Sequence, residues 1–414
     1  MKLKSLRSKL MARRSALGQV SLLWANTHVG QLISFVYLVA VIRQLNLVGF
    51  SEYVVGFAFS AIGAIFVDFG TNGIFSSQVA ASQRDKTRAK SDLRTIRCVT
   101  TSLLAILGCI LYSAGGLTLI MYTGLMVGAL SVFNESWLLQ AEGRVKHFIF
   151  ADTIARASTL VTWILISTQV ATAFTALLSL GVGYLIRSIY TNTMTRVHGS
   201  VFTIPDRLSN LFSIAAPIVA GKFLYSLTNQ LTPIVFAFNT SKGALGVYSS
   251  AEKPVRALQA GANSYEVFAN PRIARKLNDP DLIRHVKKHL ITLAGLTSVL
   301  AIFVIVFAPV LSVLLLGVVD DQFVVCSRIL AVLPVFSSLT NLIGVAVTPL
   351  LGETKINILS ASFGVLTLGL GILLTPKPLT SMSMAVIILL VEVSIAAVSV
   401  TWTLSHLKRR ELEK

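Results

Sequence analysis

The sequence carries little charge, and most of that charge has one sign. Only 13% of the 414 residues are charged, and 36 Lys and Arg stand against 18 Asp and Glu. Hydrophobic residues make up 54% of the chain, and the mean hydropathy is +0.74. A bilayer is crossed by about 20 mostly apolar residues, and a soluble domain is rarely this apolar. The composition excludes an ordinary soluble protein and predicts a multi-pass membrane protein.

Cysteine and catalytic motifs are also scarce. The three cysteines, Cys98, Cys109 and Cys326, lack metal-site spacing, and we expect no structural disulfide. There is no G-x-x-x-x-G-K-[ST], H-E-x-x-H or G-x-S-x-G motif. HVKKH at 285–289 spaces two histidines as a metal site would, but its basic neighbours would repel a metal ion. We therefore expect no metal, no cofactor and no enzyme activity, and coupling to protons or sodium stays open.

Long apolar runs are what the sequence has in abundance. They are too long and too uniformly apolar for the alternating strands of a membrane barrel, so they predict transmembrane helices. The twelve expected spans are 19–41, 50–74, 98–115, 117–139, 148–168, 170–189, 211–238, 243–269, 290–317, 323–350, 356–375 and 382–405. The predicted fold is an all-α integral membrane protein with twelve transmembrane helices.

The basic residues are placed asymmetrically around these spans. If the N-terminus is cytoplasmic, only Arg43, Lys242 and Lys377 fall in outer loops. This is the positive-inside pattern of a protein with both termini cytoplasmic, so the excess of basic residues does not indicate nucleic-acid binding. No small-residue cleavage pattern follows the basic first residues, so we expect a retained cytoplasmic end and not a signal peptide.

The longest polar break divides the chain into two halves. It covers 190–210, contains Pro205 and several Ser, Thr and Asn, and follows six expected spans. We predict an N-lobe at 1–189, a cytoplasmic linker at 190–210, a C-lobe at 211–405 and a basic cytoplasmic tail at 406–414.

The stretch GVYSSAEKPVRAL at 246–258 opens a polar face inside the eighth span. Its polar residues advance in steps of four, three, four and three, which is one face of a helix: Glu252, Arg256, Gln259, Asn263 and Glu266. Charged groups at depth cost several kcal/mol unless they are paired or hydrated. Two interpretations stay open. Glu252 and Arg256 form an internal ion pair, or the face, with Lys253, lines a hydrated cavity.

Other spans carry fewer polar groups. Lys222 and Asn229 share a face of the seventh span, and Gln31 lies on the first. The deep cations Lys222, Lys253 and Arg256 gather in the second half and indicate an anionic ligand, because a guanidinium binds phosphate with two parallel hydrogen bonds.

Acidic residues mark the inner ends of the spans in the first half. Asp152 and Arg156 are spaced i, i+4 in the fifth span, while Asp68 and Glu135 end the second and fourth. Each of these is interpreted as a salt-bridge latch or as a helix-end charge.

Three stretches resemble one known family. FVDFGTNG at 66–73 is similar to its Asp-Phe-Gly ending of the second span, and WLLQAEGRVKHFIFADTIAR at 137–156 to its Trp-Leu-Phe-Gln-Gly stretch, with Ala141 where Gly is common. LYSLTNQLTPIVFAFNTSKGALGVYSSAEK at 224–253 is similar to its signature across spans seven and eight. The chain resembles the polysaccharide repeat-unit flippases, the Wzx or O-antigen transporter family. Their superfamily also holds the multidrug MATE exporters and the lipid II flippase.

The resemblance implies two six-helix lobes that alternate access to a central cavity. It implies that oligosaccharide repeat units linked to undecaprenyl pyrophosphate, of O-antigen or a related surface polysaccharide, move from the cytoplasmic to the periplasmic leaflet of the inner membrane. Membrane lipid is an expected partner, as are the polysaccharide polymerase and chain-length machinery. Two alternatives are a multidrug or organic-cation exporter of the same superfamily and a membrane polysaccharide polymerase or ligase.

On this interpretation the polar residues divide into three groups. Those expected to bind pyrophosphate or acidic sugars are Arg256, Lys253 and Lys222. Those expected to bind sugar hydroxyls are Gln259, Asn263, Asn229 and Gln31. Those expected to act in gating or ion coupling are Glu252, Asp152, Arg156, Glu135, Asp68 and Glu266.

Overall fold

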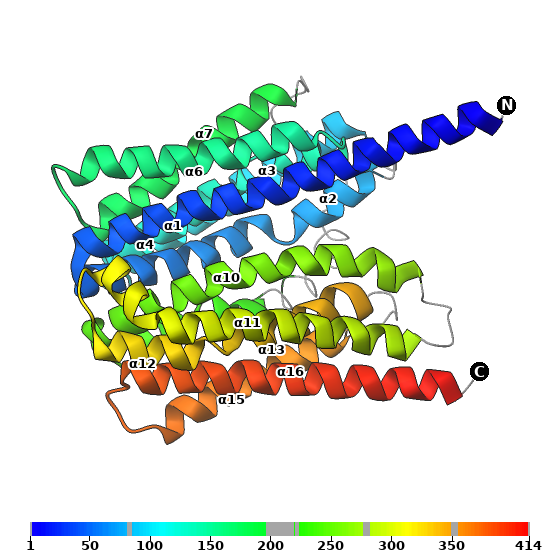
Figure 1. The fold of residues 1–414 in the computed structure, drawn as a ribbon. Helices are drawn as coiled ribbons and strands as arrows, with labels where there is room; N and C mark the ends of the chain where they lie inside the picture. Colours follow the sequence, from blue (N-terminus) through cyan, green and yellow to red (C-terminus); the bar gives the residue numbers. More distant parts are fainter. Residues whose placement is uncertain are drawn as a thin grey trace. The chain divides into compact units, whose positions relative to one another are not determined.

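The computed structural model describes residues 2–80, 85–195, 219, 223–275, 282–348 and 355–412. Its helices in chain order are α1 (Lys2–Asp68), α2 (Thr71–Ala80), α3 (Lys86–Ser113), α4 (Leu119–Val132), α5 (Ser136–Ala141), α6 (Val145–Ser167), α7 (Ala173–Met194), α9 (Thr232–Ala237), α10 (Lys242–Arg275), α11 (Leu282–Leu316), α12 (Asp321–Leu330), α13 (Leu333–Leu342), the π-helical turn η1 (Ile343–Val347), α15 (Lys355–Leu374) and α16 (Ser381–Leu412) (Figure 1). The all-α fold class is confirmed.

Eight segments of the described chain are long and apolar enough to cross a membrane. They are α1 from Val29, α3, α6 from Lys146, α7, α11, α12 together with α13, α15, and α16 to Arg409. The chain is therefore a multi-pass membrane protein. Twelve spans and cytoplasmic termini stay predictions. The helix α10, where the eighth span is expected, differs in carrying Glu252, Lys253 and Arg256 close together.

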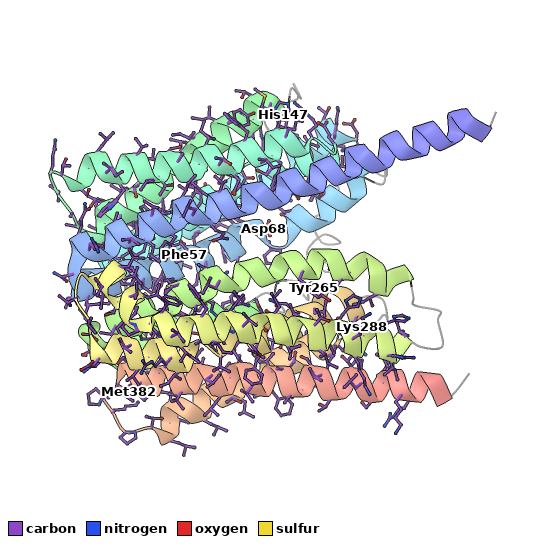
Figure 2. The ribbon with its side chains drawn as sticks, viewed as in Figure 1. Phe57, Asp68, His147, Tyr265, Lys288 and Met382 are labelled. Carbon is purple, nitrogen blue, oxygen red and sulfur yellow. The ribbon has the colours of Figure 1, made fainter. Side chains whose placement is uncertain are left out.

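The first two expected spans meet at a corner inside α1. Two helices join at Asn46, whose backbone has φ 55° and ψ 178°, a positive-φ conformation that residues other than glycine rarely adopt. Its Oδ1 accepts hydrogen bonds from the backbone N–H groups of Val48 at 3.0 Å and Gly49 at 3.1 Å. Asn46 thus caps the second helix, which ends at Asp68, labelled in Figure 2.

Residue contacts divide the chain into two compact units. The first unit comprises Met1–Leu38 and Phe66–Ala215, and the second comprises Val39–Ile65 and Ala216–Lys414. The corner at Asn46 therefore belongs to the second unit, although it precedes most of the first in sequence. The lobe and linker limits expected from the sequence stay a prediction.

Specific contacts fix the Val39–Ile65 segment within the second unit. Arg43 donates hydrogen bonds to the carbonyl oxygens of Leu314 at 2.9 Å and Val313 at 3.0 Å, near the C-terminal end of α11. A cation is favourable there because the C-terminal end of a helix carries partial negative charge. At Gly246 of α10, an added Cβ would lie 2.1 Å from the carbonyl oxygen of Leu47. Only glycine allows this close approach between the corner and α10.

Within the first unit, α6 and α7 are packed together along their length. A Cβ added at Gly183 of α7 would lie 2.1 Å from Oγ1 of Thr159 and 2.6 Å from the carbonyl oxygen of Ala155, both on α6. The absent side chain lets the two backbones approach closely. The fully buried Trp163 of α6 packs edge-on against Tyr37 of α1, with ring centroids 6.4 Å apart.

Within the second unit, α10, α11 and α16 run side by side (Figure 1). One buried apolar cluster joins α10, α11, α13, η1 and α16, and its fully buried members include Ala269, Val286, Leu293 and Leu342. Packing therefore fixes α10 at both ends, because Gly246 near its start contacts the α1 corner and Ala269 near its end belongs to the apolar cluster. The polar face of α10 lies on the same helix.

Candidate functional site

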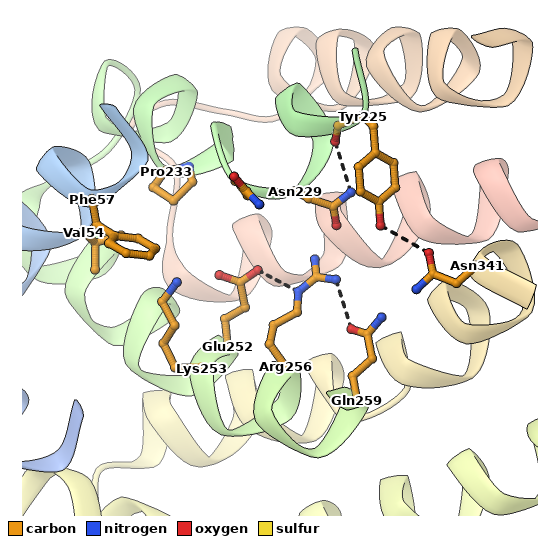
Figure 3. Close-up of a pocket in the computed structure, with 11 residues that line it drawn as sticks. Val54, Phe57, Tyr225, Asn229, Pro233, Glu252, Lys253, Arg256, Gln259 and Asn341 are labelled. Atoms are coloured by element: carbon orange, nitrogen blue, oxygen red, sulfur yellow. Dashed lines mark hydrogen bonds and ion pairs between the residues drawn. The ribbon is translucent and has the colours of Figure 1, made fainter. Parts of the chain in front are cut away.

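A pocket of about 290 Å³ lies within the second unit, beside the polar face of α10 (Figure 3). Its walls come from the second helix of α1, the helical residues 223–229, α9 and the loop before it, α10 and α13. The lining residues are Val54, Phe57, Tyr225, Asn229, Gln230, Pro233, Glu252, Lys253, Arg256, Gln259 and Asn341. Segments from distant parts of the sequence thus surround one polar space.

Arg256 is held by two glutamates. Its Nε lies 3.3 Å from Oε1 of Glu252, one turn earlier on α10, and its Nη1 lies 3.1 Å from Oε1 of Glu392 on α16. Both glutamates are 4% exposed. Nη1 also donates to Oε1 of Gln259 at 3.3 Å. We call Glu252, Arg256 and Glu392 the two-glutamate cluster. Its formal charge is −1, so the protein itself neutralises the guanidinium.

Lys253 is the pocket cation that the protein leaves available. Its Nζ lies 5.5 Å from the centroid of the Phe57 ring, a cation–π contact. It makes no ion pair and no hydrogen bond with any residue in the described ranges. Figure 3 shows its side chain pointing toward Phe57 and away from Arg256. An anion entering the pocket would therefore meet Lys253 as its unneutralised partner.

Amide and phenol groups make up most of the remaining polar lining. The Tyr225 hydroxyl donates to Oδ1 of Asn341 at 3.3 Å, and Nδ2 of Asn229 donates to the Tyr225 carbonyl oxygen at 3.1 Å. Gln230 and Gln259 add two further amides. Each amide offers both donors and an acceptor. This set suits a ligand rich in hydroxyl groups, which also donate and accept.

A second charged cluster lies in the first unit, where α6, α7 and α1 meet. Nε of Arg156 donates to Oδ2 of Asp152 at 2.9 Å, and Nη1 of Arg187 lies 3.8 Å from Oδ1 of the same aspartate. Nη1 of Arg156 also donates to Oγ of Ser34 at 2.6 Å and to the Gly30 carbonyl oxygen at 3.3 Å. We call Asp152, Arg156 and Arg187 the two-arginine cluster. Its formal charge is +1.

Sequence reasoning missed Arg187 as a site residue, because it lies close to the end of an expected span. The available signal was Gly183, one turn earlier on the same face of α7. A glycine within a span that permits close helix approach, followed by an arginine at i+4, places that arginine against the neighbouring helix. Glu392 reaches Arg256 from a different helix, so this contact depends on tertiary structure.

The ion pair between Glu252 and Arg256 predicted from their spacing is confirmed. The same helix face also lines the pocket, so the two interpretations of this face are compatible. Asn229, Lys253, Arg256 and Gln259 are brought together there, as expected for a shared site. Whether they bind substrate stays a prediction.

Other expected site residues lie apart from this pocket. Gln31 is half-buried on α1 in the first unit. Glu135 accepts from Nε of Arg94 at 2.9 Å and from Nε1 of Trp137 at 2.8 Å. Oδ1 of Asp68 accepts from the Asn72 backbone at 3.3 Å.

Three of the expected residues have no described side chain. Lys222 lies outside the described residues, as do the side chains of Asn263 and Glu266 on α10. The Asp152–Arg156 pair exists, and its predicted gating role stays a prediction. Among the residues that the structure describes, no group of three or more His, Cys, Asp and Glu could hold a metal ion.

Comparison with solved structures identifies the fold. A multidrug resistance MATE family transporter of the MOP superfamily, in an inward-facing conformation, matches with a TM-score of 0.60 and 14% identity over 94% of this chain and 96% of that one. The MATE transporter ClbM in complex with Rb+ gives a TM-score of 0.57 and 15% identity over 93% and 94%. A MOP superfamily transporter from Pyrococcus furiosus, noted for the reverse polarity of its binding pocket, gives 0.53 and 14% over 94% and 96%.

The fold therefore defines a multi-pass membrane protein with the architecture of the MOP transporter superfamily. A sequence profile of the family described as polysaccharide biosynthesis protein matches residues 17–277, more than half of the chain. The chain belongs to the polysaccharide biosynthesis protein family. A comparison with curated proteins gave no significant match.

Proposed function

We propose that this protein is a flippase for lipid-linked oligosaccharide repeat units of a surface polysaccharide, carried on undecaprenyl pyrophosphate across the inner membrane. The observation that supports this most is the pocket of the second unit. It combines four amides and a tyrosine with one unneutralised cation, Lys253. Membership of the polysaccharide biosynthesis family supports the same substrate class.

The chemistry of such a substrate requires a polar site inside the membrane. An ion without a partner costs tens of kcal/mol to desolvate in the idealised limit, and buried sugar hydroxyls need hydrogen-bond partners. A pocket lined by polar side chains supplies the hydrogen bonds that the sugars lose when they leave water, while the lipid tail stays in the hydrocarbon of the bilayer. The amides then bind hydroxyls, Phe57 offers an apolar ring face, and Lys253 binds an acidic sugar. The membrane potential favours outward movement of negative charge by about 2.3 kcal/mol per charge per 100 mV.

Export of organic cations is a second candidate. The MATE fold supports it equally, and Glu252 with Glu392 gives the pocket side of α10 an excess of carboxylate over guanidinium. The likeness to the Pyrococcus furiosus protein, whose binding pocket has reverse polarity, makes pocket charge the property to test. Lys253 opposes a cationic ligand, and it is therefore the residue on which the two candidates differ most.

The test uses a deletion strain complemented with the wild-type protein, with Lys253→Met or with the control variant Lys288→Met. Lys288 is an exposed lysine of the same unit and is labelled in Figure 2. Surface polysaccharide is stained, and lipid-linked units are extracted from each leaflet. We expect the deletion to lose surface polymer and accumulate single units on the cytoplasmic leaflet. Lys288→Met restores the wild-type state, and Lys253→Met does not.

Two results would overturn the proposal. Normal polysaccharide with raised drug sensitivity in the deletion strain would establish cation export. Single units that reach the outer leaflet without polymerising would establish a polymerase.

A further inference from the structure

The two-arginine cluster of the first unit contains a guanidinium with almost no partner. Arg187 makes one ion pair, at 3.8 Å to Asp152, and donates no hydrogen bond to any residue in the part of the chain that the structure covers. Its side chain is only 20% exposed, and its Nε is buried. A buried guanidinium without acceptors is unfavourable, because its five N–H groups lose water and gain nothing in return. The arrangement lacks an acceptor-rich partner.

The packing of three helices keeps both arginines in place. Gly183 brings α7 close to α6 one turn before Arg187, and Gly30 of α1 leaves room for the guanidinium end of Arg156. A Cβ at Gly30 would lie 3.1 Å from Nε of Arg156. At 1.5 Å per residue, Arg187 lies about 10 Å inside α7 from its end at Met194, well within the helix.

The charge balance of the cluster selects an anion. Asp152 is shared by two arginines, so the cluster keeps one positive charge. The two-glutamate cluster of the second unit has the opposite balance, and Arg256 already has two carboxylates. A phosphate offers several acceptor oxygens, and guanidinium pairs bind it with parallel hydrogen bonds.

We propose that Arg156 and Arg187 form a phosphate site, and that this site binds the pyrophosphate of the lipid carrier. This rests on the proposed function only in naming the lipid carrier as the source of the phosphate. The proposed phosphate site is therefore the pair of Arg156 and Arg187, and not Arg256, where the sequence predicts it. Arg187 has no other role assigned in this protein. Asp152 is the carboxylate that the two guanidinium groups share, and it competes with a phosphate for them.

The test measures binding to the purified full-length protein in nanodiscs. The probes are undecaprenyl pyrophosphate, undecaprenol, which has the same tail without phosphate, and inorganic pyrophosphate. We expect Arg187→Gln to weaken undecaprenyl pyrophosphate binding about tenfold or more, the effect of losing a charge-assisted hydrogen bond. Arg187→Lys keeps the positive charge but loses the two parallel N–H donors of the guanidinium. We expect its affinity to lie between those of the wild type and Arg187→Gln. Arg88→Gln, an exposed arginine of the same unit, leaves binding unchanged.

A gain-of-binding variant separates this role from a structural one. Asp152→Asn removes the competing carboxylate, so the cluster gains a charge, and we expect phosphate binding to tighten by a few fold at low salt. If Asp152 and Arg187 served only to stabilise α6 and α7, Asp152→Asn would lower the melting temperature and leave affinity unchanged or weaker. That result would overturn the site.

The outcomes also distinguish the site from the function. Arg187-dependent binding of inorganic pyrophosphate as tight as that of the lipid supports the site and makes the free anion its source. Equal binding of undecaprenyl pyrophosphate by wild type and Arg187→Gln overturns the site, and the flippase proposal stands if the deletion strain still accumulates lipid-linked units. Equal binding of undecaprenol and undecaprenyl pyrophosphate by the wild type overturns phosphate recognition altogether.

Discussion

The two charged clusters are built alike and end with opposite charge. Each starts from an acidic residue and an arginine spaced i, i+4 on one helix, Asp152 with Arg156 on α6 and Glu252 with Arg256 on α10. Each takes its third member from a neighbouring helix. That member is Arg187 in the first unit and Glu392 in the second. The third residue alone sets the net charge at +1 or −1.

The comparison shows that an ion pair within a helix says little about the ligand a site will take. The two i, i+4 pairs are equivalent in sequence, and each gives its arginine one carboxylate on the same helix. What remains available to a ligand depends on the residue that arrives from outside the helix. In the second unit this residue gives Arg256 a second carboxylate, although its Nη2 keeps no hydrogen-bond partner among the described residues, and Lys253 is left to meet an anion. In the first unit it adds a second, unsatisfied guanidinium.

The largest expected effect comes from removing the shared partner of the two glutamates. Arg256→Ala leaves Glu252 and Glu392, both 4% exposed, without their cation. We expect a loss of about 3–5 kcal/mol in unfolding free energy, the range for breaking a buried ion pair. Arg156→Ala leaves Asp152 beside Arg187 in a more exposed setting, so its loss is smaller, about 1–2 kcal/mol. Thermal unfolding in detergent measures both.

A double variant sharpens this result. Arg256→Ala combined with Glu392→Ala removes one of the two stranded carboxylates and recovers part of the lost stability, which makes the two changes non-additive. Losses that add, or equal losses for Arg156→Ala and Arg256→Ala, would mean that burial does not separate the clusters.

An intermediate effect is expected where glycine permits close packing beside each cluster. Gly246→Ala would place a Cβ 2.1 Å from the Leu47 carbonyl oxygen, and Gly183→Ala would press against Thr159 and Ala155. Each is expected to lose about 1–3 kcal/mol through displaced helices. Gly243, on the same helix as Gly246, has open space around it. Gly243→Ala should raise the free energy of unfolding by about 0.5–1 kcal/mol through helix propensity. A loss of stability in this variant would show that α10 tolerates no substitution of glycine, whether or not the backbone is closely packed.

The smallest effect on stability is expected at an exposed ion pair of the second unit. Lys242 pairs with Glu52 at 2.6 Å, but the lysine side chain is 65% exposed. Exposed ion pairs contribute about 0.2–1 kcal/mol, so Lys242→Ala should shift the melting temperature little, and less at high salt. A shift as large as that of Arg256→Ala would contradict the view that burial decides the strength of these pairs.

Much of the fold was predictable because membrane insertion leaves a simple pattern. The apolar runs predicted the helices, and the spacing from Glu252 through Gln259 predicted the polar face of α10. Both predictions were possible because hydropathy and helical spacing are local properties of the sequence. The corner at Asn46 was placed only as a gap between spans, since its positive-φ backbone has no strong sequence signal. The docking of 39–65 onto α10 and α11 was not predictable, because Arg43 and Gly246 find their partners far along the chain.

The sequence by itself determined that this is a helical membrane protein and which helix faces are polar, and it offered the pairing of Glu252 with Arg256 as one of two interpretations. Those properties follow from hydropathy and from the helical repeat. Tertiary structure alone decided that Glu392 neutralises Arg256, that Lys253 stays available over Phe57, and that Arg187 joins Arg156 on Asp152. The reason is physical. The charge that a site offers its ligand is the sum over residues from several helices, and only packing brings those residues together.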